Sequence, residues 1–276
     1  MESILIPIDF SADSINALEH AVVLANKSGS WLRMLHVMKS KHFQVPDYFR
    51  DIDKFYGNSV EDYFKILMKK FRAKVKTGID YTIAEGKVYR EICNLAIADN
   101  SSLIMMGTHG ISGFEEFWVG SNAFRVVSNS PCPVITIRNG FLRKNIKKII
   151  LPIDITLETR QKVPFTVKLA RIFNAEIHIV SVRESGASDI MKRLDEYVVQ
   201  VSDYIQGKGI RCVKDALLGS NITEMTIEYA ISVNAELISI MTEQVSSAKN
   251  IWMGNYAQQM VNHSPIPVLS FHPLND

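Results

Sequence analysis

Cysteine is scarce in this sequence. Three cysteines occur in 276 residues, Cys93, Cys132 and Cys212, and none of them stands in a CxxC pair. An odd number without such a pair argues against a disulfide framework and against the common zinc sites. We therefore expect small buried thiols and a reducing, cytoplasmic environment.

Net charge and long apolar runs are also lacking. The chain has 31 Lys and Arg residues against 29 Asp and Glu residues. The densest basic stretch, 69–76, has the pattern of a solvated helix face, so we expect neither a nucleic-acid surface nor an anionic membrane surface. No apolar run approaches the 18 or so residues of a membrane span, and MESILIPIDF lacks the charged start and apolar core of a signal peptide. These features predict a cytoplasmic protein without a membrane partner.

What the sequence does contain is a regular alternation of short apolar runs and longer helical patterns. This order is typical of a parallel sheet covered by helices. In the first half we predict strands at 3–8, 31–37, 79–84, 103–106 and 134–138, and helices at 12–28, 60–77, 88–100 and 121–130. In the second half we predict strands at 148–153, 176–182, 210–217, 237–241 and 268–271, and helices at 160–173, 190–208, 222–233 and 256–263.

The two halves also correspond residue by residue. Adding 134 carries Trp118 to Trp252 and Pro131 to Pro265, and LIPID at 5–9 is nearly repeated by ILPID at 150–154. We therefore predict two tandem α/β domains at 1–140 and 145–276, each a five-stranded parallel sheet flanked by helices. Segment 38–59 is long for a connection and is interpreted either as a lid or partner surface or as a plain insertion.

A glycine-rich stretch follows the fourth predicted strand. The run LIMM ends directly at Gly107, Gly110 follows, and after nine intervening residues Gly120 and Ser121 open a predicted helix. Glycines let the backbone reach positive φ and approach a phosphate closely, and a helix start offers free amides to an anion. Ser121 either caps its helix or donates to a phosphate oxygen.

The full stretch MGTHGISGFEEFWVGS, followed by PCPV, resembles the signature of ATP-binding universal stress proteins. The LIPIDFS start and the domain length are similar to that family too. The resemblance implies Rossmann-like domains and an adenine-nucleotide site, with Mg²⁺ shared by phosphate oxygens. The positions that match the family's contacts are Pro7, Asp9, Val37, Met106, Gly107, Gly110, Gly120, Ser121 and Asn122.

Several of these residues also have a purely structural interpretation. Val37 and Met106 fit core positions equally well, and Asp9 is also a candidate helix cap. Ile111 stands where the family usually has a basic residue, and Asn122 replaces a common small apolar residue. His109 lies in the loop without a carboxylate partner at a fixed spacing, so we assign no catalytic residue.

The second half has lost the loop. Adding 134 carries Gly107 to Met241, Gly110 to Gln244 and Ser121 to Asn255, whereas Gly254 is retained. We therefore predict one nucleotide site per chain, in the first domain, and a second domain that serves packing or regulation, pairing internally as a pseudo-dimer.

Three functions stay open on the sequence. The leading one is an ATP-binding stress-response regulator with an unknown protein partner. The second is an enzyme at the same site, a slow ATPase, autokinase or nucleotidyl transferase, with Asp9 as the residue to test. The third is a nucleotide-free scaffold that forms homodimers through the terminal strand at 134–138.

Overall fold

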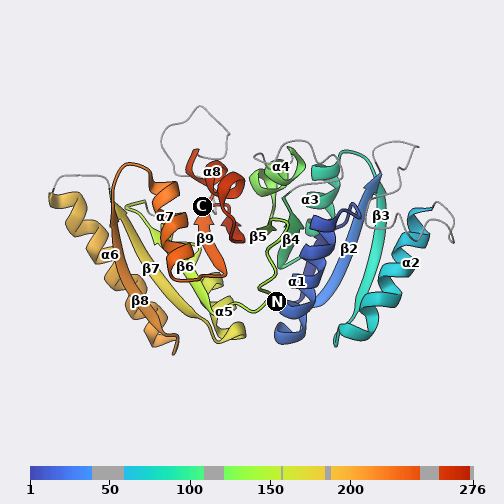
Figure 1. Cartoon of the computed structure of the whole chain (residues 1–276), viewed down its shortest axis with the longest axis horizontal. Helices are drawn as coiled ribbons and strands as arrows, with labels where there is room; N and C mark the ends of the chain where they lie inside the picture. The colour runs from blue at the N-terminus through green and yellow to red at the C-terminus, as the bar shows by residue number, and fades with distance from the viewer. Residues whose placement is uncertain (39–58, 109–120, 157, 184–187, 243–254, 274–276) are drawn as a thin grey trace. The chain divides into compact units, whose positions relative to one another are not determined.

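The chain forms two compact units, Met1–Leu142 and Arg143–Asp276. The computed structural model describes residues 1–38, 59–108, 121–156, 158–183, 188–242 and 255–273. Figure 1 shows a sheet with packed helices in each unit. The predicted lid or insertion at 38–59 lies outside the described residues except for its two ends.

The sheet of unit 1 has five parallel strands in the order β3-β2-β1-β4-β5. After β3 the chain crosses back to the other side of β1, so the direction of winding reverses between β1 and β4. Sheets of this type bind ligands at the carboxyl ends of the strands beside such a reversal. The strands are β1 (Ser3–Pro7), β2 (Trp31–Met38), β3 (Ile79–Glu85), β4 (Leu103–Gly107) and β5 (Val134–Ile137).

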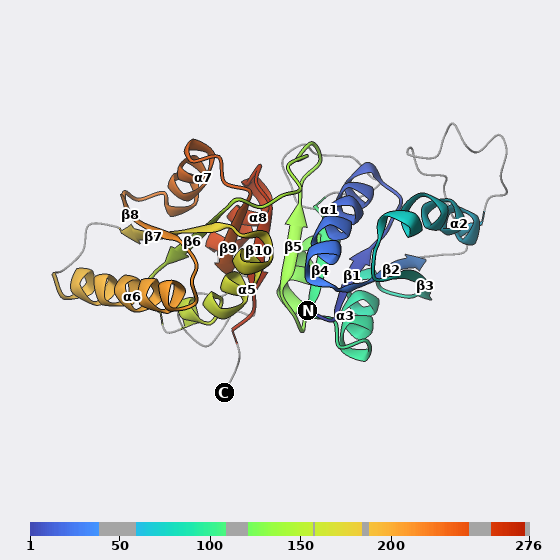
Figure 2. The same ribbon diagram turned by 90° about the horizontal axis from the view of Figure 1, so that it is seen from below.

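The helices of unit 1 cover both faces of its sheet. Figure 2 shows α1 (Ala12–Ser28) and α2 (Val60–Phe71) on one side and α3 (Val88–Ala98) on the other. A 3-10 turn, Arg72–Lys74, follows α2, and α4 (Ser121–Asn129) contacts α3. The Ser11 hydroxyl caps α1 at its start, and Gly29 ends it with φ of 74°.

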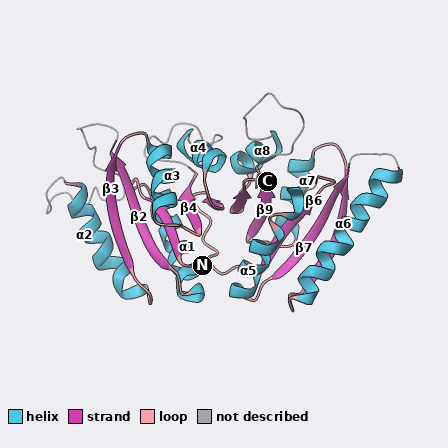
Figure 3. Ribbon diagram, turned by 180° about the vertical axis from the view of Figure 1, so that it is seen from behind, coloured by secondary structure: helices cyan, strands magenta, loops and turns pink. Residues whose placement is uncertain are grey.

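Unit 2 repeats this architecture with parallel strands in the order β8-β7-β6-β9-β10. Figure 3 shows its strands between helices. The strands are β6 (Lys148–Ile153), β7 (Glu176–Arg183), β8 (Cys212–Leu218), β9 (Leu237–Met241) and β10 (Val268–Phe271). The helices are α5 (Val163–Phe173), α6 (Ser188–Gly207), α7 (Ile222–Ser232) and α8 (Asn255–His263), with a 3-10 turn at Glu158–Arg160.

The predicted fold class is confirmed, because both sheets are five-stranded, parallel and covered by helices. The run LIMMG of β4 and the run LISIM of β9 are buried along their whole length, as expected for central parallel strands. None of the described helices has the length and apolar character needed to cross a membrane.

One predicted boundary is wrong in a way that bears on the site. The pattern predicts a helix from residue 160, but α5 begins at Val163, with Pro164 in its first turn. Proline is favoured at a helix start because its missing N–H has no partner there. The residues before α5 form the 3-10 turn Glu158–Arg160 instead of the regular first turn that α1 has.

Candidate functional site

Several of the predicted site residues lie at the carboxyl edge of the unit 1 sheet. β1 ends at Pro7 and β4 ends at Gly107, on either side of the winding reversal. α4 begins at Ser121, and Asn122 in its first turn is half-buried. Gly110 and Gly120 lie outside the described residues, as does His109.

Asp9 organises the turn between β1 and α1. Its Oδ1 accepts hydrogen bonds from the Ser11 backbone N–H at 3.0 Å and from the Ser11 hydroxyl at 2.6 Å. The Ser11 Oγ in turn accepts from the Ser14 N–H at 3.2 Å and caps α1. Asp9 therefore holds the capping residue in place, while Ser11 is the N-cap. The half-buried carboxylate stands close to the positive end of α1, where a negative charge is favourable.

Phe10, which the sequence pattern does not single out, has a strained backbone in this turn. Its φ is 63°, in the left-handed region that a bulky side chain adopts at a cost of about 1 to 2 kcal/mol. Its ring is fully buried and lies 5.0 Å from the His36 ring, 5.5 Å from Tyr63 and 5.1 Å from Phe64, measured between centroids. This aromatic packing offsets the strain and fixes the direction in which Asp9 leaves β1.

His36 supports the same turn from β2. Its Nδ1 lies 2.7 Å from the Ile8 carbonyl oxygen, which fixes that nitrogen as the donor. Burial lowers the pKa of His36, opposed by its hydrogen bond to Ile8 and by the charge of Asp9. We therefore take His36 as a neutral positioning residue that joins the ends of β1 and β2.

Val37 and Met106 are nearly buried, 9% and 6% exposed. Both occupy strand ends in the core, Val37 in β2 and Met106 in β4 beside Thr136 of β5. Most of the surface of both side chains is therefore packed in the core, as the alternative interpretation of these two residues expects. Contact with a nucleotide base stays a prediction that rests on their small exposed share.

Gly107 corrects part of the sequence argument. Among the described glycines, positive φ values occur at Gly29, Gly86, Gly140 and Gly209, so Gly107 does not use the positive φ that a glycine allows. Its actual requirement is space, because a Cβ at Gly107 would lie 2.7 Å from the Cβ of Asp13 and 2.9 Å from its carbonyl carbon. Gly107 thus permits the first turn of α1 to pack directly on the end of β4.

Unit 2 keeps the turn but has a buried methionine in place of Gly107. Asp154 Oδ1 accepts from the Thr156 N–H at 2.7 Å and from its hydroxyl at 2.5 Å, as Asp9 does from Ser11. Met241, the counterpart of Gly107, is buried at the end of β9. On this side the α-helix begins only at Val163, nine residues after Asp154, whereas α1 begins three residues after Asp9. Gln244 and Gly254 lie outside the described residues.

Two further polar groups are buried near Asp154. Lys162 is 2% exposed, and its ammonium donates to the Thr159 Oγ1 at 2.9 Å. Burial lowers the pKa of Lys162 to about 8, partly opposed by Asp154. The hydroxyl of Tyr256, the counterpart of Asn122, has no hydrogen-bond partner of good geometry in the described part of the chain. Burial raises the pKa of Tyr256, and the charge of Asp154 adds to that shift.

The described residues offer no metal cage. They contain no group of three or more His, Cys, Asp or Glu side chains placed to hold an ion. Asp9 already accepts two hydrogen bonds on one oxygen. A Mg²⁺ ion at this edge would therefore need phosphate oxygens and water for most of its ligands.

A sequence model of the universal stress protein family matches the chain twice, over residues 1–138 and 145–272. Universal stress protein YxiE of Bacillus subtilis is 32% identical over 145 residues, covering 49% of this chain and 97% of its own. Universal stress protein MJ0531 of Methanocaldococcus jannaschii is 28% identical over 151 residues, covering 50% and 82%.

Solved structures show the same fold across the whole chain. A universal stress protein from Archaeoglobus fulgidus superposes with a TM-score of 0.75 at 19% identity, covering 99% of this chain and 98% of its own. A protein from Pseudomonas aeruginosa described as functionally unknown, PA1789, gives a TM-score of 0.73 at 16% identity, covering 99% and 93%. With both halves matched by the family's sequence model, this chain belongs to the universal stress protein family, with two family domains in tandem.

Proposed function

We propose that unit 1 binds one adenine nucleotide, ATP or a related adenylate, and that the chain acts as a nucleotide-dependent regulatory protein in the stress response. The proposal rests on one observation: three chain segments meet where the direction of winding reverses in unit 1. There β1 delivers the Asp9 turn, β4 ends at Gly107, and α4 opens at Ser121. The loop GTHGISGFEEFWVGS connects the last two.

Each part has a physical role in this proposal. The free amides at the start of α4 bind phosphate oxygens, and the dipole of the helix favours their negative charge. Pro7 and Asp9 border the adenine and ribose, while Val37 and Met106 offer apolar contact to the base. Gly110, Gly120, Ser121 and Asn122 complete the phosphate contacts, with Mg²⁺ held by the phosphates. The turn braced by Ser11 and Phe10 keeps Asp9 in place before the ligand arrives.

The second unit is not expected to bind nucleotide in this way. Met241 is buried at the end of β9, where unit 1 has Gly107, and Tyr256 stands where unit 1 has Asn122. Near Asp154, unit 2 has the buried hydroxyl of Tyr256 and the buried ammonium of Lys162, whereas a phosphate site requires accessible backbone N–H groups. We therefore propose one site per chain and a packing or regulatory role for unit 2.

Calorimetric titration of the full chain with ATP, ADP and AMP tests the proposal. The Gly110→Gln variant, which copies the second unit's Gln244, is expected to lose binding. Gly207→Gln is the matched control, because a Cβ at Gly207 meets no atom within 4 Å. Absence of binding to any adenine nucleotide by the wild-type chain would sink the proposal and favour the scaffold alternative.

The enzyme alternative is tested in the same preparations by phosphate release. Hydrolysis that disappears in Gly110→Gln and persists in Asp9→Asn would make Asp9 part of the binding apparatus only. The internal pseudo-dimer, a homodimer and a cytoplasmic location stay predictions, and sedimentation velocity tests the second of these.

A further inference from the structure

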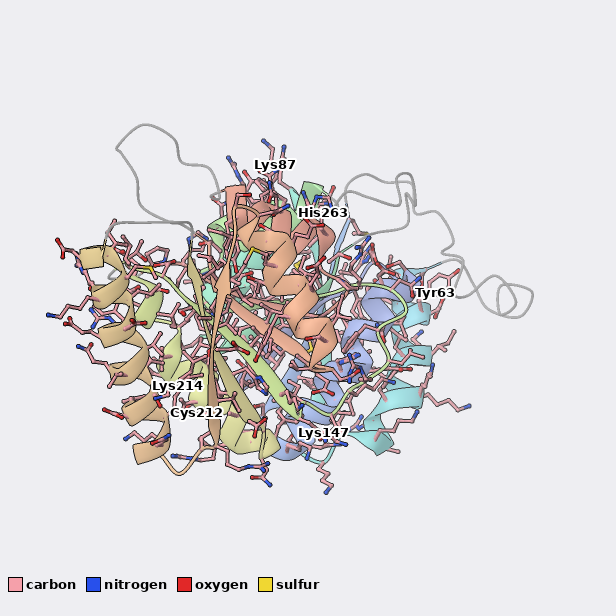
Figure 4. The ribbon with its side chains drawn as sticks, turned by 60° about the vertical axis from the view of Figure 1, so that its left-hand side comes forward. Tyr63, Lys87, Lys147, Cys212, Lys214 and His263 are labelled. Atoms are coloured by element: carbon pink, nitrogen blue, oxygen red, sulfur yellow. The ribbon has the colours of Figure 1, made fainter. Side chains whose placement is uncertain are left out.

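Three cations gather around one tyrosine at the rim of unit 1. Lys87, Tyr89 and Arg90 stand at the start of α3, and Arg125 stands on α4. We call these four residues the cationic rim. Figure 4 shows Lys87 at the margin of the molecule, beyond the ribbon. All three cations are exposed, whereas Tyr89 is half-buried and serves as their common platform.

The geometry of the rim is specific. Arg90 Nε donates to the Tyr89 hydroxyl at 3.1 Å, and the Arg90 guanidinium carbon lies 5.9 Å from the centre of the ring. The guanidinium carbon of Arg125 lies 5.5 Å from the same centre, within the range of cation–π attraction. The hydrogen bond from Arg90 lowers the pKa of Tyr89, and the charges of Arg90, Lys87 and Arg125 lower it further.

These charges have no acidic partners in the described part of the chain. No ion pair there includes Lys87, Arg90 or Arg125. The nearest acid in the first turn of α3 is Glu91, whose carboxylate lies over Gly86 instead. Among the described residues, the cationic rim therefore carries positive charge without an ion-pair partner.

The position of the charges is unfavourable for α3 itself. Lys87 is the N-cap residue of α3 and makes no side-chain capping bond, and Arg90 stands in the first turn. Cations at a helix N-terminus oppose the helix dipole, and capping residues are normally Ser, Thr, Asp or Asn. An anion bound at the rim would offset both the repulsion between these cations and the helix dipole and the lack of a side-chain cap.

Unit 2 has no cation at the same positions. Adding 134 gives Asn221, Thr223, Glu224 and Gln259 in place of the four rim residues. Asn221 caps α7 and donates to Glu224 Oε2 at 2.7 Å, and the Thr223 hydroxyl donates to Gln259 Oε1 at 2.9 Å. The shared fold therefore does not require the cations. They belong to unit 1 alone, the unit with the complete nucleotide loop.

We propose that the cationic rim binds the distal phosphates of the nucleotide held by unit 1, so that the preferred ligand class is an adenine nucleotide with three or more phosphates. This inference rests on the proposed function. Arg125 follows Ser121 by four residues on α4 and so lies on the same helix face, about 6 Å along the axis. A phosphate chain that begins at the α4 amides is thereby within reach of the guanidinium groups, whose fork suits phosphate oxygens.

The test compares AMP, ATP and adenosine tetraphosphate by calorimetry on the full chain. The triple variant Lys87→Asn, Arg90→Gln, Arg125→Gln replaces the cations with uncharged amide side chains. We expect its affinity for ATP and for the tetraphosphate to fall about tenfold or more, with AMP within about twofold of wild type. The control Arg72→Gln, Lys74→Gln, Lys76→Gln removes the same charge from exposed positions elsewhere in unit 1 and is expected to leave all three affinities unchanged.

Inorganic tripolyphosphate provides a second arm that does not need the base site. We expect it to raise the melting temperature of the wild-type chain and not of the rim variant. If no nucleotide binds, the proposed function fails, and the tripolyphosphate arm still decides the rim. Equal responses of wild type and rim variant to tripolyphosphate would overturn the inference. So would poly-glutamate binding to the rim as tightly as tripolyphosphate, which would identify a surface for acidic polypeptides.

Discussion

The buried ammonium of Lys162 is expected to destabilise unit 2 at neutral pH. Desolvation lowers its pKa to about 8, against about 10.5 in the unfolded chain. At about 1.4 kcal/mol for each pKa unit, the difference of 2.5 corresponds to about 3 kcal/mol. That penalty is complete below pH 8, where both states are protonated. It shrinks from pH 8 to 10.5, because the folded state releases its proton first.

Replacing Lys162 by Met removes the charge and keeps a long flexible chain. The variant also loses the hydrogen bond to Thr159, which offsets about 1 to 2 kcal/mol of the gain. Lys162→Met is therefore expected to raise the free energy of unfolding by about 1 to 2 kcal/mol at pH 7. By pH 9.5 the penalty in the wild type falls by about 2 kcal/mol, so the advantage of Met disappears.

Urea unfolding at pH 7.0 and pH 9.5 measures this difference. Lys168→Met, an exposed site on the same helix, is the control and is expected to change stability equally at both pH values. A Lys162→Met effect that does not vary between the two pH values would refute the reasoning about the buried charge.

Three other substitutions test the local packing. Gly107→Ala is expected to lower the stability of unit 1 by about 1 to 3 kcal/mol in urea, because its Cβ meets Asp13, whereas Gly207→Ala is not destabilising. Ser11→Ala removes the α1 cap and is expected to cost about 1 kcal/mol by thermal unfolding, with Thr156→Ala less harmful because no helix starts there. Glu236→Ala leaves the N–H groups of Lys147 and Lys148 without their carboxylate, at 2.9 and 3.0 Å, and is expected to cost about 1 to 3 kcal/mol. An unchanged unfolding midpoint in any of the three would contradict the role given to that residue.

Much of the fold follows from patterns that are local in the sequence. The apolar runs of β4 and β9 and the amphipathic helices between strands are visible without a structure, and the repeat doubles the evidence for each element. The start of α5 was missed because Arg160 and Lys162 fit a helical pattern, while Pro164 favours a later start.

Less of the site could be predicted from the sequence, and the physical reason differs from residue to residue. Gly107 stands out in the sequence, but its close approach to Asp13 depends on how α1 packs on β4. No local rule places Phe10 at positive φ, since the strain is compensated by rings from distant helices and strands. The cationic rim escapes notice because Arg125 lies 35 residues beyond Arg90, and only packing brings both to Tyr89.

The central claim is that one nucleotide site exists per chain, at the carboxyl edge of unit 1. Mass spectrometry of nucleotide released from denatured purified protein, quantified against chain concentration after saturation with ATP and desalting, tests it most directly. The account predicts one adenine nucleotide per chain, lost in Gly110→Gln. Two nucleotides per chain, or none at saturating ATP, would contradict it.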